Sequence, residues 1–158
     1  MNEELLKAVR EILSIARRDF KHAGELMTAA YIFYRDEGRL AVRLLVVPEG
    51  FESDDQKGIF SRTIEDHARH VHAVGVLFLA ESWAVDGIDL RAHPEWIGRL
   101  FEHPDRREVV NGTLSTPNGG YMFNAHIERD GDSVSLGEFS ERAVEVSGRF
   151  ASFFDKVN

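Results

Sequence analysis

The hydrophobic positions of the chain repeat first with the spacing of helices and then with the alternation of strands. Residues 3–21 carry apolar side chains three and four positions apart, which predicts an amphipathic helix. A second stretch of this kind, residues 54–71, follows Ser53 and Gln56, which fit a capping box at a helix start. A third, residues 138–156, predicts a C-terminal helix that buries phenylalanines.

Strands are predicted over residues 26–35, 39–47, 73–85, 107–116, 120–128 and 132–137. Short turns such as Asp36-Glu37-Gly38 join neighbouring strands, which favours antiparallel pairing. The expected fold class is therefore α+β, with a mostly antiparallel sheet of about six strands and N-terminal, middle and C-terminal helices packed on it. Residues 1–158 are expected to form a single domain of this class.

The strand predicted over residues 39–47 has two faces of different character. Its apolar face holds Leu40, Val42, Leu44 and Val46, whereas Arg39 and Arg43 lie on the other face. This alternation predicts that the apolar face belongs to the core and that the arginine face is partly wet.

The strand predicted over residues 73–85 is apolar on both faces, so we expect it to be central and covered on both sides. Glu81 interrupts this apolar run. A buried carboxylate must be paired, hydrogen-bonded or neutralised. Glu81 is therefore either a structural group, in an ion pair with Arg106 or Arg107 or at a strand end that reaches water, or a general acid or base with a shifted pKa.

The segment His103-Pro104-Asp105-Arg106-Arg107-Glu108 places both charge signs and an imidazole just before a strand. Arg106 is suited to hold an anionic ligand with a fork of hydrogen bonds, and His103 to move a proton. The alternative is a solvated turn with local salt bridges. Upstream of it, Trp96, Leu100 and Phe101 predict a short helix that acts as a lid or as a self-association patch.

Three histidines, His67, His70 and His72, lie around the end of the second predicted helix. Their spacing matches no compact zinc motif, so a metal site that combines them with His103 or His126 is the lesser alternative. His67 falls on the apolar stripe and is expected to be a hydrogen-bonded core histidine. Asn124 and His126 share one strand face, which is either a ligand wall or the wet side of the sheet.

Charge and composition narrow the classes of function. The net charge is −8 and neither half of the chain is basic, which disfavours nucleic acid and anionic membranes as partners. The chain has no cysteine, which excludes thiolate chemistry and disulfides. Its acidic N-terminus is unlike a signal peptide, and its longest apolar run, Ala73 to Ala80, is too short to span a bilayer. A cytoplasmic location is therefore expected.

The strand end Ala80-Glu81-Ser82-Trp83, followed after a loop by His103-Pro104-Asp105-Arg106-Arg107-Glu108, resembles a pattern in small bacterial proteins of unknown function. No activity comes with this resemblance, but it implies that the two segments belong to one structural unit.

These observations together predict an uncharacterised, bacterial-type binding or interaction module. Its candidate ligand site is formed by Glu81, Trp83, His103, Asp105 and Arg106. The alternative is a hydrolase-like acid–base enzyme that uses Glu81 and His103, with Arg106 as an anion clamp. No cofactor is expected, and the expected association is with a protein partner or in a homo-oligomer.

Overall fold

A computed structural model of the chain describes residues 3–47, 50–145, 149–151, 153 and 154. In this part, the order of elements is α1 (Glu3–Ala23), β1 (Thr28–Asp36), β2 (Arg39–Val47), α2 (Asp54–His70), β3 (Gly75–Ala84), β4 (Arg107–Thr116), β5 (Gly119–Asp130), β6 (Ser133–Leu136) and β7 (Ser140–Val144). Two short 3-10 turns, Pro94–Trp96 and Leu100–Glu102, lie between β3 and β4. The predicted α+β class and the first two predicted helices are confirmed.

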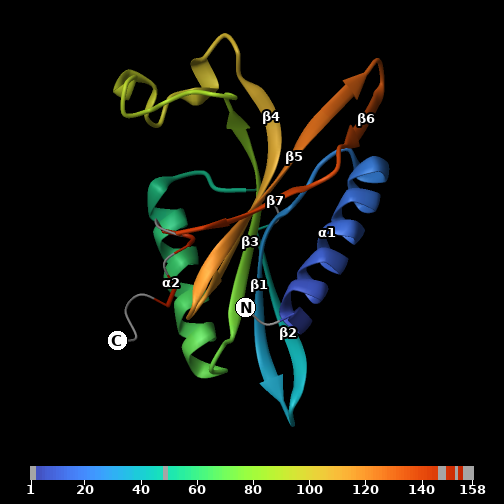
Figure 1. Cartoon of the computed structure of the whole chain (residues 1–158), viewed down its shortest axis with the longest axis vertical. Coiled ribbons are helices and arrows are strands. Elements are labelled where there is room, and N and C mark those ends of the chain that lie inside the picture. The colour runs from blue at the N-terminus through green and yellow to red at the C-terminus, as the bar shows by residue number, and fades with distance from the viewer. Residues whose placement is uncertain (1–2, 48–49, 146–148, 152, 155–158) are drawn as a thin grey trace.

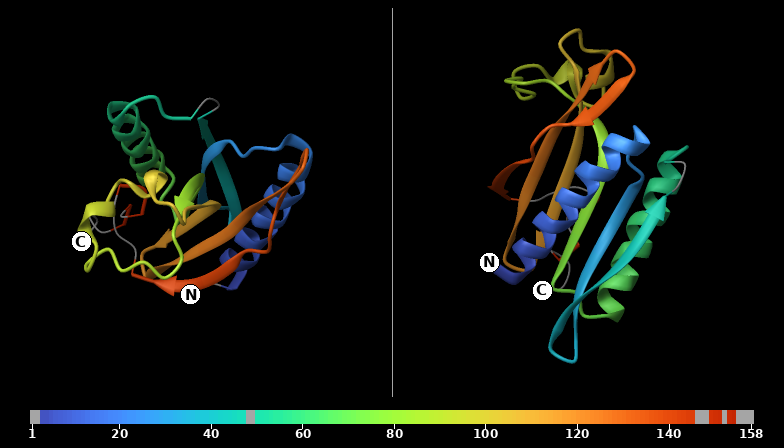
Figure 2. Two further views of the ribbon diagram at one scale, coloured as in Figure 1. Left: turned by 90° about the horizontal axis from the view of Figure 1, so that it is seen from above. Right: turned by 90° about the vertical axis from the view of Figure 1, so that its right-hand side faces the viewer.

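The strands form an antiparallel sheet in the order β2-β1-β3-β4-β5-β6, and β7 pairs with another part of the β5 edge (Figure 1). The two helices lie on opposite faces of this sheet, as the two further views show (Figure 2). β3 lies between β1 and β4, which agrees with its predicted central position.

The predicted C-terminal helix over residues 138–156 is wrong in the part that the structure describes. Residues Ser140–Val144 form β7, in which Glu141 is paired with Phe123 of β5. Residues 149–151 form a turn, and residues 146–148, 152, 155 and 156 lie outside the described residues. The strand is favoured because it supplies backbone partners to the β5 edge, and Arg10 of α1 reaches Glu141 with a 2.7 Å contact.

α1 builds the larger core by packing on one face of the sheet. Its buried stripe is Leu5, Leu6, Val9, Leu13, Ala16 and Phe20, and the facing sheet residues include Phe33, Leu77, Leu79, Val110, Leu114 and Phe123. A methyl group on Gly75 would lie only 2.9 Å from Leu5 Cδ2, so the missing side chain allows α1 to approach β3 closely.

α2 and the segment near the C-terminus cover the other face of the sheet. Ile64 and Ala68 of α2 pack with Ala30, Ile32 and Val76. The rings of Phe78 and Phe150 are stacked with centroids 4.1 Å apart. Ser115 Oγ donates a 2.7 Å hydrogen bond to the carbonyl of Ala151, which fixes residues 149–151 against β4. Phe150 therefore covers β3 without being part of a helix.

The prediction that the apolar face of β2 belongs to the core is wrong for most of that face, although Leu40 packs against the α1 core. Val42, Leu44 and Val46 on the apolar face are 36–50% exposed, while Arg43 on the other face is half-buried. Arg43 donates a 3.1 Å hydrogen bond to Nδ1 of His67, the predicted hydrogen-bonded histidine. The reason is that β2 is an edge strand, so the helix that covers its neighbours leaves Val42, Leu44 and Val46 exposed.

Substitution of Phe20 tests how much the packing of α1 on the sheet contributes to stability. Because its side chain is 1% exposed, Phe20→Ala should lower the free energy of unfolding in urea by about 3–5 kcal/mol. Ile15 on the same helix is exposed, so Ile15→Ala should change it by less than about 1 kcal/mol. Equal effects of the two variants would contradict this packing.

Candidate functional site

β3 leaves the core between Leu79 and Glu81. Leu79 is buried, whereas Glu81, Ser82 and Trp83 are exposed, so the expectation that the whole strand is covered on both faces is wrong. The paired ends of β3 and β4 project beyond the end of α2 and carry residues 85–106, named here the 85–106 loop (Figure 1). Glu81 therefore lies where the strand reaches solvent.

Glu81 does not form the expected ion pair with Arg106 or Arg107. Its Oε2 accepts a weak 3.5 Å hydrogen bond from the N–H of Leu26. Desolvation raises the pKa of Glu81, the Leu26 bond opposes this rise, and the nearby carboxylates of Glu108 and Glu25 add to it. The carboxyl group thus helps to hold the turn before β1, away from the loop arginines.

The charges of the 102–108 segment are paired elsewhere. Arg107 lies 3.3 Å from Asp86, and Glu108 accepts two hydrogen bonds, of 2.7 and 2.9 Å, from Arg129. The Arg129 guanidinium lowers the pKa of Glu108. Both ion pairs lie at the surface, so each contributes little to stability.

Four of the five predicted site residues lie together at the base of the 85–106 loop. The guanidinium of Arg106 lies 5.3 Å from the centroid of the Trp83 ring and donates a 3.0 Å hydrogen bond to the His103 carbonyl. His103 Nδ1 accepts the N–H of Asp105 at 3.0 Å, and its ring lies 4.6 Å from that of Trp96. Glu81 is the member that does not join this group.

The 85–106 loop lines an open, acidic pocket of about 340 Å³. The pocket is lined by Val85, Asp86, Gly87, Ile88, Asp89, His93, Trp96, His103 and Asp105. Asp86 contacts Arg107, and Asp89 accepts the N–H of Arg91 at 3.0 Å. The lining thus holds three carboxylates, one of them already paired with Arg107, and no lysine or arginine.

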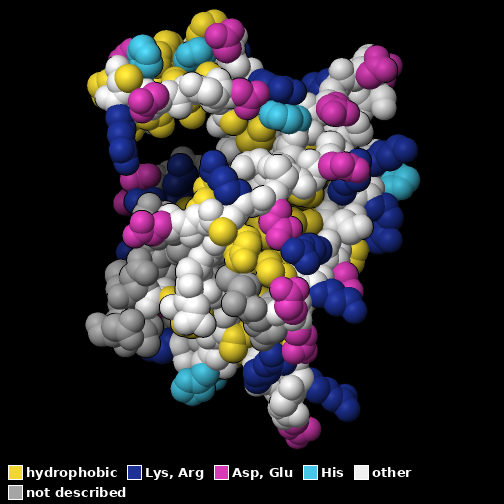
Figure 3. Space-filling view, viewed as in Figure 1, with side chains coloured by type: hydrophobic (Ala, Val, Ile, Leu, Met, Phe, Trp, Pro, Cys, Tyr) yellow, Lys and Arg dark blue, Asp and Glu magenta, His cyan; other side chains and the backbone are white. Residues whose placement is uncertain are grey.

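The outer side of the loop exposes large apolar side chains. Trp83 is 41%, Ile97 62% and Phe101 53% exposed. Figure 3 shows hydrophobic and histidine side chains gathered over this end of the molecule. The predicted short helix is present as the two 3-10 turns, and the turn Leu100–Glu102 lies against β3 while Phe101 points to solvent. These three exposed side chains are the apolar part of the candidate site.

Two polar atoms inside the sheet were not singled out by sequence reasoning as a pair. Asn111 Oδ1 and His126 Nδ1 are buried and have no hydrogen-bond partner among the described residues. Asn111 belongs to β4 and His126 to the neighbouring β5, and both side chains lie on the α2 face of the sheet. His126 is paired with Val109, two residues before Asn111. In the sequence, Asn111 could have been noticed as an amide side chain that interrupts the apolar residues of β4.

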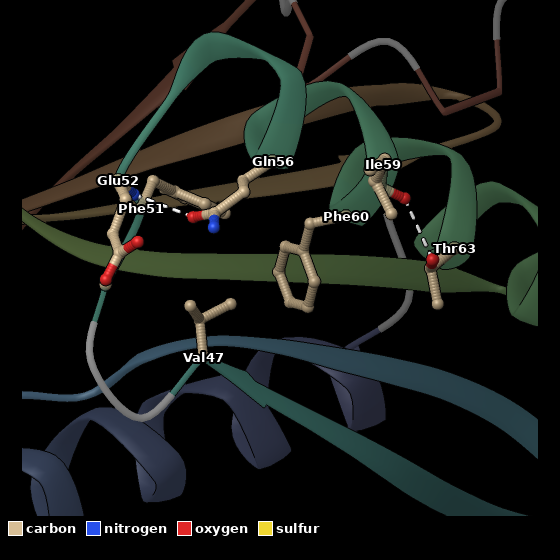
Figure 4. Close-up of a pocket in the computed structure, with 8 residues that line it drawn as sticks. Val47, Phe51, Glu52, Gln56, Ile59, Phe60 and Thr63 are labelled. Atoms are coloured by element: carbon tan, nitrogen blue, oxygen red, sulfur yellow. Dashed lines mark hydrogen bonds between the residues drawn. The ribbon is translucent and has the colours of Figure 1, made fainter.

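A second pocket, of about 520 Å³, lies beside the first turn of α2 (Figure 4). Phe60 points from α2 toward Val47 across it. Its polar groups bond to one another, since Glu52 N–H donates to Gln56 Oε1 and Thr63 Oγ1 to the Ile59 carbonyl. This leaves an apolar hollow without a group that suggests a reaction.

Within the described part of the chain, no three His, Asp or Glu side chains are placed to hold a metal ion. His67, one of the candidate ligands, bonds to Arg43 instead. None of the helices described is both long and apolar enough to cross a membrane.

Together, these features define a small α+β protein with an exposed aromatic and arginine surface on a strand-to-strand loop. Residues 1–156 match the family model described as Bacteriophage lambda protein ea47, so the chain belongs to this family. No curated protein and no solved structure matches the chain. The resemblance to small bacterial proteins stays a prediction.

The opposite pKa shifts of Glu81 and Glu108 give a paired test. A raised folded-state pKa means that the stability from neutral Glu81 is complete below its ordinary value of 4.5 and is lost as pH rises through the folded value. Glu81→Gln should therefore gain stability relative to wild type between pH 4.5 and 7, because glutamine can still accept from Leu26.

Glu108→Gln should behave in the opposite way. The stability that comes from the lowered pKa of Glu108 is present above 4.5 and is lost as pH falls through the folded value. This variant should therefore have a slightly smaller free energy of unfolding than wild type at pH 7. Urea unfolding from pH 3 to 7 measures both. Changes of the same sign in the two variants would refute the assignment.

Proposed function

We propose that this protein is a binding module that docks on another protein through Trp83 and the 85–106 loop. The observation that carries the proposal is the length of this loop. Ala84 is paired with Arg107, so a short turn would be enough to join β3 to β4. Loops longer than about 12–15 residues without regular structure are uncommon and usually functional.

Trp83 and Arg106 form the centre of the proposed surface. Tryptophan and arginine are enriched among the residues that dominate binding energy at protein interfaces. The stacking of the Arg106 guanidinium over Trp83 holds both side chains in place before a partner arrives, which reduces the entropy cost of binding. Ile97 and Phe101 supply further apolar area on the same loop.

The acidic pocket favours a partner with a basic side chain at its centre. Asp86, Asp89 and Asp105 line the pocket, and the net charge of the chain is −8. A partner with a basic surface would be attracted at long range, so its association rate should fall as salt is added. The backbone N–H of Asp105 donates to His103 Nδ1, and this bond positions the loop.

Two observations favour binding over the hydrolase-like alternative. Glu81 accepts from Leu26 and is not among the residues that line the pocket with His103. His103 Nδ1 is occupied by the Asp105 N–H, and Arg106 lies over Trp83. An acid–base pair would need both groups within reach of one cleft.

The test begins with capture of proteins from a bacterial lysate on the tagged chain, followed by identification and purification of each captured protein. Binding of the purified partner is then measured for wild type and for Trp83→Ala. A residue of this kind contributes about 2 kcal/mol or more, so Kd should rise about 30-fold or more.

Ile59→Ala is the matched control, because Ile59 is an exposed apolar residue on α2, away from the loop. This variant should bind as wild type does. If every captured partner binds Trp83→Ala and Arg106→Ala as tightly as wild type, the proposed surface is wrong.

A further inference from the structure

We propose that a second copy of this chain pairs with the free edge of β2, so that the two sheets join in an antiparallel manner about Leu44. This surface is separate from the 85–106 loop, and the inference does not depend on the proposed function. It rests on the free backbone groups of β2, on the side chains that flank them, and on the fit of the strand to its own copy.

The hairpin geometry determines which backbone groups of β2 are free. Glu37 and Gly38 have φ values of 51° and 81° and form a two-residue turn between Asp36 and Arg39. Such a turn closes on a hydrogen-bonded pair, and bonded and non-bonded pairs then alternate along the hairpin. The N–H and C=O groups of Leu40, Val42, Leu44 and Val46 therefore point away from β1, to the edge.

No strand in the described part of the chain pairs with this edge. An exposed, long and apolar edge strand is a template for pairing with another chain. β2 has nine residues and includes no proline or lysine that would block such pairing. Arg43, one of its two charged residues, is turned to the α2 face and bonds to His67.

The residues with free backbone groups also carry exposed apolar side chains. Val42, Leu44 and Val46 form a row along the edge. Next to them lies a groove of about 410 Å³ between α1 and β2, in which the exposed Ile15 and Met27 continue the apolar surface. Five of the nine large hydrophobic side chains that are exposed in the described residues therefore lie in this one region.

The charges and the apolar row of β2 together favour one register for its copy. Pairing about Arg43 would place two guanidiniums directly opposite, which is destabilising. Pairing about Val42 would leave Val46 opposite the turn residue Gly38, and pairing about Leu45 would leave Val42 without a partner in the row. Pairing about Leu44 places Leu44 opposite itself, Val42 opposite Val46 of the second copy, and Arg43 opposite Leu45.

In the register about Leu44, every exposed apolar residue of the row meets another one, and no charge meets a like charge. The strand is therefore complementary to itself, which is the requirement for a two-fold dimer interface. This fit is the reason to assign the edge to a second copy of the chain and not to a different protein.

The first experiment measures the mass of the full chain in solution by light scattering over a range of concentrations. Wild type should reach twice the 17.9 kDa of one chain. Leu44→Lys places two like charges on the two-fold axis and should abolish the dimer while the far-UV circular dichroism is unchanged. Ile59→Lys, at an exposed position on α2, should remain dimeric.

The second experiment tests the register by cysteine cross-linking, which the absence of cysteine from the chain makes specific. Leu44→Cys should form a disulfide-linked dimer under mild oxidation. Val42→Cys should cross-link only when it is mixed with Val46→Cys, and Ile59→Cys should not cross-link. A wild type that stays monomeric, a dimeric Leu44→Lys, or equal cross-linking of Leu44→Cys and Ile59→Cys would each overturn the proposal.

Discussion

The burial of α1 against one face of the antiparallel sheet is the interaction on which the rest of the structure depends. The helix covers β1, β3, β4 and β5 with one continuous apolar stripe. Arg17 Nε donates a 2.9 Å hydrogen bond to the Leu136 carbonyl in β6, so α1 also contacts the edge strand farthest from β2. In the described part of the sheet, the Val42–Val46 row of β2 and the end of β3 beyond Ala80 remain uncovered, and the two proposed interaction surfaces lie there.

The groups that stabilise the fold differ from those that we propose to contact partners. Burial of apolar side chains such as Phe20 and Leu79 supplies the main stabilising free energy. The exposed ion pairs, Glu108 with Arg129 and Arg107 with Asp86, add little. Changes in the 85–106 loop should therefore affect binding with only small effects on folding.

The sequence predicts the local elements of this protein well, because periodic patterns report directly on helices and strands. The bounds of β2 and β4 agree with the prediction, and the Ser53 cap is present, with Gln56 N–H donating to Ser53 Oγ. The C-terminal helix fails because an apolar spacing of three and four residues does not reveal that a free edge of β5 competes for the same segment.

The other wrong predictions, for the faces of β2 and the partner of Glu81, depend on contacts between segments that are distant in the sequence. The alternation in β2 shows that one face is apolar, but not whether a helix covers it. The four site residues Trp83, His103, Asp105 and Arg106 could be grouped because most of them are neighbours in one loop. The partner of Glu81 could not be found, because Leu26 comes from a distant turn and offers only its backbone.

The most direct test of the account is the stability of a chain in which residues 85–106 are replaced by Asn-Gly, so that Ala84 and Arg107 stay paired across a short turn. If the loop lies outside the core, urea unfolding of this chain should remain cooperative, with a free energy of unfolding at least as large as that of wild type, because a shorter loop costs less entropy to close. Failure of the shortened chain to fold would contradict the account, because the loop would then be part of the core.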